Sequence, residues 1–348
     1  MFKTIIMKLV MATSVLVAAT NLLSAQVYGV VNVSVNFERE QPDYAAELGN
    51  QALMGTVVTV LGKTGYWLQV RSPEPYTAWV NEMTVTLMNK EEIDAYIAAP
   101  KYIVTAEYSN IYSSPSEKSE RVSDLVMGNI LRIWTSGKHN KVVSSKGFVG
   151  VVTPSGKPGW VRAKDVENFT KWAESCNPTA NNIIATAKKM LGVCYQWGGT
   201  SIKGVDCSGL TRTAFFMNGL LLPRNTSQQV RIGDDIDCSG VFEGNFDSLL
   251  PGDLLLFGNT LTRRVSHVAI YIGDGKFIHS SQTVRISSLR RSDPDYYDRT
   301  PGLLSVRRVI GREDSNKGIH SIRKSPYYFP DNGNFVLENL SPVRQSTI

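Results

Sequence analysis

Cys207 is the residue of this sequence whose type and position best suit covalent chemistry. Leu210, Ala214 and Met217 follow it at helical spacing, so we expect a helix that begins at Cys207. The first N–H groups of a helix have no acceptor within it and lie at the positive end of its dipole. Both effects stabilise a thiolate, which is the form of cysteine that attacks. The pattern predicts a cysteine nucleophile at the start of a helix.

Two histidines are placed to serve such a nucleophile. His267 begins a strand-like run, Gly273-Asp274-Gly275 supplies a turn, and His279 ends the run that follows. The two ends of an antiparallel pair lie side by side, so we expect the two imidazoles to meet. His267 can then act as base and acid, while His279 orients it through the second ring nitrogen.

The remaining cysteines have ordinary explanations. A buried cysteine is usually an inert, small apolar residue, and we expect this of Cys176, Cys194 and Cys238. The spacings between the four cysteines match no zinc motif. Metal binding by the candidate nucleophile and the two histidines is an alternative, but no carboxylate accompanies them. We therefore expect neither a metal nor another cofactor.

The elements that must position these side chains lie in the C-terminal half of the chain. Residues 181–192 have helical spacing, with an Asn to cap the helix and a Gly to end it. Strand-like runs at 253–257 and 267–272 follow. These patterns indicate an α+β unit over about 175–311. The tail, 312–348, is polar and aperiodic, and it either wraps the domain or is partly mobile.

The N-terminal half indicates two copies of one small β-module. Alternating runs separated by Gly and Pro predict short strands. These runs are 30–35, 57–61 and 66–70. Residues 53–60 resemble 126–133, and Ala-Trp-Val at 78–80 resembles Gly-Trp-Val at 159–161. A helical link at 89–97 joins the copies. Closing a short sheet into a barrel hides its edges, so we expect barrels.

The composition and the N-terminal residues limit the compartment in which the protein acts and the partners that it can have. The chain has 348 residues, 42% of them hydrophobic, and a net charge of +6. This small excess has no basic block behind it, so we expect no nucleic-acid partner. Lys3 and Lys8, the apolar run 9–19 and a small-residue exit near Ala25 predict a signal peptide over 1–25. The run is too short to span a bilayer. We expect export to the periplasm or cell envelope, and no integral membrane span.

Four motifs together resemble those of NlpC/P60 cysteine peptidases of bacterial cell walls. In the family's order they are Tyr-Gln-Trp-Gly-Gly at 195–199, Asp-Cys-Ser-Gly at 206–209, Pro-Gly-Asp-Leu at 251–254 and Ser-His-Val-Ala-Ile-Tyr-Ile-Gly at 266–273. The resemblance covers about 175–311 and implies an α+β, papain-like catalytic domain.

The two β-modules resemble bacterial SH3 (SH3b) domains, which are small SH3-like β-barrels. The first would span 26–90 and the second 101–170. The whole layout is similar to the dipeptidyl-peptidase VI type, the γ-D-glutamyl-L-diamino acid endopeptidases.

The resemblance implies roles for individual residues of the candidate catalytic domain. The implied roles are Cys207 as nucleophile, His267 as base, His279 as third polar residue, Tyr195 as a site-lining group that helps to stabilise the oxyanion, and Asp206 and Ser208 as substrate contacts. In the segment 223–229, Asn225 stands where relatives usually carry Asp. A charge-dependent contact at this position is therefore in doubt, and Asn225 and Thr226 are candidate substrate-binding residues.

The first module resembles a wall that closes one end of the cleft in similar enzymes and reads a free amino terminus. The matching stretch is 46–55, in which Glu47 could pair with a substrate ammonium. Tyr76 could hydrogen-bond beside it. The other interpretation of Glu47 is a solvated surface carboxylate.

The resemblance implies an exported endopeptidase. It would cleave the γ-D-glutamyl–diamino acid bond of peptidoglycan stem peptides, preferring those with a free N-terminal L-Ala. One alternative is a non-catalytic peptidoglycan-binding protein, against which the intact set of Cys207, His267 and His279 speaks. Another is an amidase or acyltransferase on the same fold.

Overall fold

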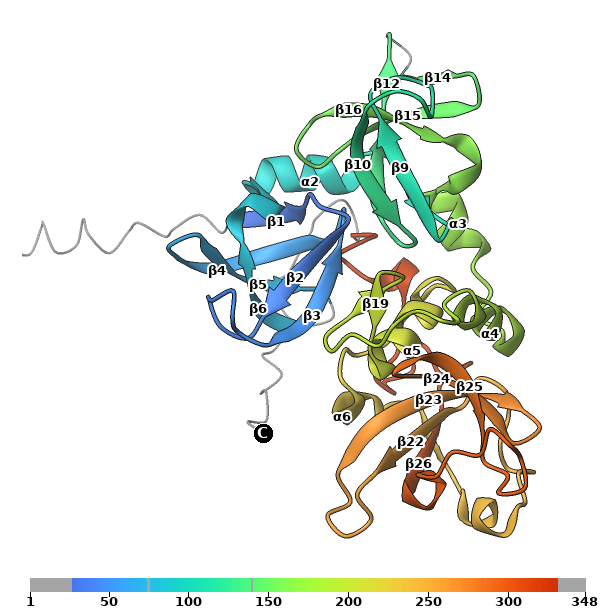
Figure 1. Cartoon of the computed structure of the whole chain (residues 1–348). Coiled ribbons are helices and arrows are strands. Elements are labelled where there is room, and N and C mark those ends of the chain that lie inside the picture. Colours follow the sequence, from blue (N-terminus) through green and yellow to red (C-terminus); the bar gives the residue numbers. More distant parts are fainter. Residues whose placement is uncertain (1–26, 74–75, 139, 331–348) are drawn as a thin grey trace, which may run out of the picture.

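The computed structural model describes residues 27–73, 76–138 and 140–330 of the chain. The predicted signal peptide therefore lies outside the described residues. Three units follow one another: a first module (27–88), a second module (101–168) and a C-terminal unit (169–330) (Figure 1). None of the helices within these ranges is long and apolar enough to cross a membrane.

The first module is a seven-stranded sheet in the order β3-β2-β6-β5-β4-β1-β7. Its strands are β1 (Val27–Val31), β2 (Val35–Arg39), β3 (Leu48–Leu53), β4 (Val57–Thr64), β5 (Trp67–Ser72), β6 (Tyr76–Asn81) and β7 (Val85–Met88), with a 3₁₀ turn at Glu82–Thr84. The run 30–35, expected as one strand, is divided between β1 and β2. The backbone at Asn32 and Ser34 bonds to other segments, so the ladder is interrupted there.

The second module repeats this plan. Its main path, β10-β9-β16-β15-β11-β8-β17, has the strand order of the first module, copy for copy. The strands are β8 (Lys101–Val104), β9 (Tyr108–Tyr112), β10 (Arg121–Val126), β11 (Ile130–Ile133), β15 (Phe148–Val152), β16 (Pro158–Arg162) and β17 (Val166–Asn168), with the short β12 (Thr135–Ser136), β13 (Lys141–Val142) and β14 (Ser144–Ser145) and a 3₁₀ turn at Ala163–Asp165. The chain therefore contains one strand plan twice, as the similar segments of sequence indicate.

A helix and two matched glycines join the modules. Helix α2 (Lys90–Ala98) begins at the Asn89 cap, as the link at 89–97 predicts. Gly55 and Gly128 occupy equivalent turns and have φ values of 90° and 92°. The modules meet there, because the Ile130 N–H donates to the Met54 carbonyl at 2.8 Å.

The C-terminal unit combines four helices with an antiparallel sheet in the order β21-β26-β22-β23-β24-β25. The helices are α3 (Phe169–Ser175), α4 (Ala180–Lys188), α5 (Cys207–Phe216) and α6 (Thr226–Gln229), and the sheet strands are β21 (Asp234–Ile236), β22 (Leu254–Gly258), β23 (Val265–Gly273), β24 (Lys276–Ser281), β25 (Thr283–Ser288) and β26 (Leu303–Arg308). Helix α4 is capped by Thr179 and not by the expected Asn, because the Thr179 hydroxyl accepts the Asn182 N–H.

Buried apolar residues cover both faces of this sheet. Leu254 and Leu256 belong to the cluster shared with α4 and α5, whereas Leu255 and Phe257 belong to the cluster on the other face. A strand buried on both faces explains the uninterrupted apolar run at 254–257. Helix α5 packs against β23 and β24, and so the helix start lies beside the histidine hairpin (Figure 1).

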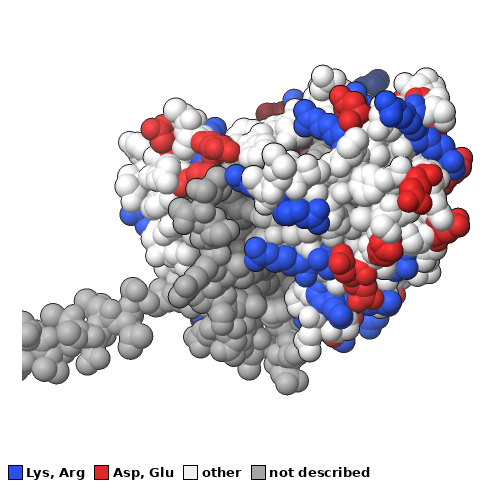
Figure 2. Space-filling model, turned by 90° about the horizontal axis from the view of Figure 1, so that it is seen from below, with Lys and Arg blue, Asp and Glu red and all other residues white. Residues whose placement is uncertain are grey.

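The described part of the tail wraps back over the modules. The short pairs are β18 (Thr200–Ser201) with β19 (Gly204–Val205) and β20 (Leu220–Leu221) with β27 (His320–Ser321), and further 3₁₀ turns lie at Ser239–Glu243, Thr300–Gly302 and Ile322–Lys324. Tyr327 packs into the core of the first module, and Tyr328 lies against Phe169 and Phe216. On the face seen from below, acidic and basic groups are interspersed (Figure 2).

The contact between the modules predicts an unequal effect of two glycine substitutions. Gly55→Ala would place a Cβ against the Ile130 carbonyl oxygen, closer than van der Waals contact allows, in a left-handed turn. We expect the free energy of unfolding to fall by about 1–3 kcal/mol or more, measured by urea denaturation. Gly156→Ala is the control, because its φ is +85° but nothing lies within 4 Å. An equal loss in both variants would contradict the steric contact.

Candidate active site

Cys207 is the first residue of α5, as the sequence predicts, and Asp206 is its N-cap. The Asp206 Oδ1 atom accepts the Gly209 N–H at 2.7 Å. The cysteine is 6% exposed. Its backbone N–H is among the first of the helix, which have no acceptor within it. The sulfur and an N–H group without an intrahelical acceptor thus lie at the same helix end.

The Asp206 carboxylate is also fully engaged on its other side. Arg224 donates from Nη2 to Asp206 Oδ2 at 2.5 Å and from Nη1 to Oδ1 at 3.2 Å, and the Gly198 N–H donates to Oδ2 at 3.0 Å. Ser208 Oγ donates to Asp206 at 3.1 Å and accepts from Arg224 at 2.9 Å. Both residues predicted to contact substrate are therefore committed to a buried network around the helix cap.

Glycines on both sides of Cys207 allow close contact between backbone segments. A Cβ on Gly198 would meet the Leu48 carbonyl oxygen of β3, and a Cβ on Gly209 would meet the Gly199 carbonyl oxygen. Glycine lets one backbone approach another this closely because it has no side chain. The first module and the loop at 195–200 therefore approach the helix start at these positions.

The two histidines meet as the hairpin pattern predicts. His267 on β23 and His279 on β24 face each other with Nε2 and Nδ1 2.8 Å apart. The Nε2 atom of His279 lies 3.0 Å from the Ser287 hydroxyl. The Tyr297 ring packs edge-on against His279, with centroids 5.1 Å apart. Ser287 and Tyr297 are not predictable from the sequence, because no local pattern links them to the hairpin.

The Cys207 sulfur lies against the backbone of β23 beside the residue that follows His267. The N–H groups of Val268 and Ser208 hydrogen-bond to Cys207, and Val268 is the residue that follows His267. Because His279 takes the Nε2 atom of His267, Nδ1 is the ring nitrogen left for the thiol. Thr226 Oγ1 lies 3.7 Å from the sulfur. Thr226 was expected to bind substrate, and the structure places it against the nucleophile candidate.

The electrostatic environment favours an uncharged Cys207 thiol and an uncharged His267 imidazole before substrate binds. Burial raises the pKa of the Cys207 thiol, and the Asp206 carboxylate raises it further, against hydrogen bonds from Thr226 and two N–H groups that lower it. Burial, Arg299 and Arg285 lower the pKa of His267 to about 4. Burial and His267 lower the pKa of His279 to about 3. The helix N-terminus alone would favour a thiolate, but loss of water outweighs it here.

Tyr195 pairs with Val205, two residues before Cys207, and Asn225 directly precedes Thr226. The Tyr195 side chain is half-buried, and burial together with Cys207 and Asp206 raises the pKa of its phenol. The hydroxyl therefore remains a hydrogen-bond donor. Asn225 is the N-cap of α6, and its N–H donates to Gln228 Oε1 at 2.9 Å. This residue is neutral, so it supplies no charge to a ligand.

The first module brings a different carboxylate to Tyr76 than the sequence suggested. The Tyr76 hydroxyl donates to Glu40, and the Glu47 side chain is exposed. Burial and the Glu40 bond raise the pKa of Tyr76, and Arg224 opposes this. The Tyr76 hydroxyl and Glu40 lie against Gly49, and the next residue, Asn50, accepts a hydrogen bond from Arg224. Glu40 was missed because it lies after β2, outside the stretch compared.

Among the described residues, no group of three or more His, Cys, Asp or Glu side chains could hold a metal ion. The four cysteines are free thiols. Arg224 is the main site residue that sequence reasoning missed. Arg224 is 2% exposed. Arginine is usually exposed, and no local pattern in the segment 223–229 indicates that this arginine is buried against the carboxylate that caps α5.

With this geometry in place, comparisons identify the family. Residues 192–300 match the NlpC/P60 family, and residues 39–86 match the bacterial SH3 domain. A γ-D-glutamyl-L-lysine dipeptidyl-peptidase of Bacillus cereus is 32% identical over 268 residues, which are 74% of this chain and 75% of that protein. The chain belongs to the NlpC/P60 family and is a cysteine-type peptidase.

Two further similarities agree with this assignment. Dipeptidyl-peptidase 6 of Lysinibacillus sphaericus is 27% identical over 263 residues, which are 74% of this chain and 89% of that protein. The crystal structure of an NlpC/P60 family protein from Bacillus cereus superposes with a TM-score of 0.67 at 26% identity, covering 81% of this chain and 99% of that one. The expected fold class, an α+β catalytic domain after SH3-like β-structure, is confirmed.

The lowered pKa of His267 predicts an unusual pH profile. We expect the acid limb of kcat/KM on a peptide substrate near pH 4 and not near pH 6.5, because the imidazole stays neutral between these values. Replacing Arg285 and Arg299 by Gln removes two nearby positive charges, so the limb should move to higher pH. Arg323→Gln, on a turn of the tail, is the control. A wild-type limb near pH 6.5 would contradict this picture.

Proposed function

We propose that the protein is an exported endopeptidase that hydrolyses the bond between γ-D-glutamate and the diamino acid of peptidoglycan stem peptides. The observation that carries this proposal is the joint placement of Cys207 at the start of α5 and of His267 and His279 on the adjoining hairpin. The name of the similar Bacillus cereus protein, a γ-D-glutamyl-L-lysine dipeptidyl-peptidase, supports the choice of bond.

The reaction proceeds through a thioester. The Cys207 thiol gives its proton to Nδ1 of His267 as sulfur attacks the γ-carbonyl carbon of D-glutamate. The C–N bond then breaks, and the imidazolium returns the proton to the leaving amine of the diamino acid. Water next gives a proton to His267 and attacks the thioester, which releases the acid and the thiol. His279 holds the ring through Nε2 in each step.

The oxyanion is stabilised by hydrogen-bond donors at the start of α5 and on the rim of the site. The Cys207 N–H has no intrahelical acceptor, and the raised pKa of Tyr195 keeps its hydroxyl protonated. Thr226, 3.7 Å from the sulfur, supports the thiolate while it forms. A resting thiol suits this sequence of steps, because attack and proton transfer occur together.

The first module supplies the wall that selects the amino terminus of the substrate. Its strand β3 touches the loop at Gly198, and the Tyr76–Glu40 pair lies against Gly49 of the same strand. A carboxylate at this wall, Glu40 or the neighbouring Glu47, would pair with the ammonium of a free N-terminal L-Ala. Acylation removes that positive charge and leaves the carboxylate without a partner.

The second module extends the same plan and would act as a second bacterial SH3 domain that holds the enzyme on the wall polymer. Its strand order supports this assignment, because it repeats the order of the first module. Action outside the cytoplasm follows from the substrate, since stem peptides belong to the cell envelope.

Digestion of a defined tripeptide tests the mechanism. We expect L-Ala-γ-D-Glu-L-Lys or its diaminopimelate analogue to yield L-Ala-D-Glu and the free diamino acid, detected by mass spectrometry. Cys207→Ala should reduce the rate by at least about 1,000-fold with the fold retained. The control is Cys176→Ala, whose thiol lies beside Gly219, away from the hairpin. Cleavage by folded Cys207→Ala at a comparable rate would reject the nucleophile.

The amino-terminal wall is tested with the same peptide bearing an N-acetyl group. We expect acetylation to lower kcat/KM by about 10- to 100-fold, and Glu40→Gln to remove most of that discrimination. Glu47→Gln is the comparison, because this exposed carboxylate was the candidate from sequence. Loss of discrimination in Glu47→Gln alone would return the role to Glu47. Indifference of the wild type to acetylation would reject the wall.

A further inference from the structure

A buried series of hydrogen-bonded polar side chains connects the first module to the start of α5. Glu38 on β2 is 0% exposed, Asn50 on β3 is 1% exposed and Arg224 is 2% exposed. Asn50 Nδ2 donates to Glu38 Oε2 at 2.5 Å, and Arg224 Nε donates to Asn50 Oδ1 at 2.7 Å. Arg224 in turn holds both oxygens of Asp206, the cap of the nucleophile helix.

Asn50 is suited to the centre of this series because its amide has two different ends. Its oxygen accepts from Arg224 and also from Arg212 Nη1 at 3.3 Å, whereas its nitrogen donates to the Glu38 carboxylate. An amide is uncharged and presents an acceptor and a donor at fixed positions. The uncharged Asn50 lies within a network whose charges balance. The carboxylates of this network are Glu38 and Asp206, and its guanidiniums are Arg212 and Arg224.

The orientation of Arg224 depends on both of its ends. Two nitrogens fork onto Asp206, and the third, Nε, is fixed by the Asn50 oxygen. If Nε loses its acceptor, a buried donor is left unpaired and the guanidinium can rotate to recover a partner. Such a rotation would move the Asp206 carboxylate, which sets where α5 begins and hence where the sulfur lies.

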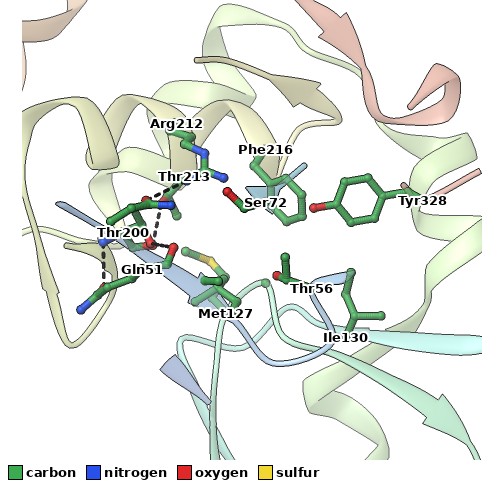
Figure 3. Close-up of a pocket in the computed structure, with 14 residues that line it drawn as sticks. Gln51, Thr56, Ser72, Met127, Ile130, Thr200, Arg212, Thr213, Phe216 and Tyr328 are labelled. Atoms are coloured by element: carbon green, nitrogen blue, oxygen red, sulfur yellow. Dashed lines mark hydrogen bonds between the residues drawn. The ribbon is translucent and has the colours of Figure 1, made fainter. Parts of the chain in front are cut away.

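A small cavity lies beside the contact between the two modules and α5. Asn50 and Arg212 line a cavity of about 50 Å³ whose other walls come from both modules and from α5 (Figure 3). Met127 and Ile130 of the second module and Phe216 of α5 border it, while Cys207 and the two histidines do not. Val126, Met127 and Leu53 pack with the apolar cluster of α5 next to this space, and the hydrogen bonds of Asn50 add a directional constraint to that packing.

We propose that Asn50 is a positioning residue for Cys207. The first module, through Asn50, fixes Arg224, and Arg224 fixes the Asp206 cap that aims the sulfur at His267. The catalytic unit thus takes part of its active-site support from another domain of the same chain. This inference rests on the proposed role of Cys207 as nucleophile and assigns Asn50 no contact with substrate.

The test reverses the hydrogen bond between Asn50 and Glu38. Asn50→Asp keeps an acceptor for Arg224 but removes the donor to Glu38, and the repulsion between the two buried carboxylates pushes the acceptor at position 50 away from its place at Arg224 Nε. The double variant Asn50→Asp with Glu38→Gln restores a donor–acceptor pair with the original total charge, because the amide now stands at position 38 and the carboxylate at position 50. Asn110→Asp on β9 of the second module is the matched control, because Asn110 is half-buried and its amide donates to the Tyr112 hydroxyl within its own module.

Two readouts are measured on each full-length variant. One is the rate of alkylation of Cys207 by iodoacetamide between pH 5 and 9, followed on the peptide that contains it. The other is kcat and KM for the stem tripeptide. We expect Asn50→Asp to lower kcat and the alkylation rate about 10- to 100-fold with KM within about twofold, since a small misplacement of a reacting atom costs this much. The double variant should recover most of both, and the control should match the wild type.

Other outcomes overturn the inference in distinct ways. A raised KM with normal alkylation would make Asn50 a substrate contact. If the double variant is as slow as the single one, or if the single variant is as fast as the wild type, Asn50 does not position Cys207. If Asn50→Asp does not fold, Asn50→Ser, which breaks both bonds without added charge, takes its place with the same expected loss. Alkylation that falls and recovers as expected in an enzyme that does not cut the tripeptide would retain the positioning role and reject the proposed substrate.

Discussion

Asp206 and Arg224 form an ion pair that is almost entirely removed from water, with side chains 8% and 2% exposed. Burying two charges is costly unless every lone pair and donor is satisfied. Here the carboxylate accepts from Gly198, Ser208, Gly209 and the guanidinium, and the guanidinium has Asn50 at its other end. The loop before the nucleophile, the nucleophile helix, the segment before α6 and the first module are therefore brought together by one group.

This arrangement explains how a buried cysteine can be ready to react without being charged. The same carboxylate that fixes the helix start raises the pKa of the thiol, and burial with two nearby arginines lowers the pKa of His267. The site thus holds a thiol that is hydrogen-bonded to the N–H of Val268 and, on the preceding residue His267, a neutral imidazole. In the proposed mechanism, proton transfer accompanies attack as negative charge begins to form on the carbonyl oxygen of the substrate.

Elements that depend on local sequence patterns could be predicted from the sequence. Contacts between segments distant in the sequence could not. The helix start at Cys207, the histidine hairpin and the repeated module follow local periodicity and turn residues, and the structure contains them. Thr226 at the sulfur and the Glu40–Tyr76 pair depend on segments distant in sequence. Even the charge state of the thiol depends on burial, which a helix-dipole argument leaves out.

Trapping the covalent intermediate tests the central claim most directly. Enzyme mixed with the stem tripeptide is quenched in acid within milliseconds to seconds, digested and examined by mass spectrometry. The account predicts a thioester on the peptide that contains Cys207, carrying L-Ala-D-Glu and formed no more slowly than free diamino acid appears. An acyl group on a residue other than Cys207 would contradict it. So would formation of L-Ala-D-Glu in the first turnover without any adduct at Cys207.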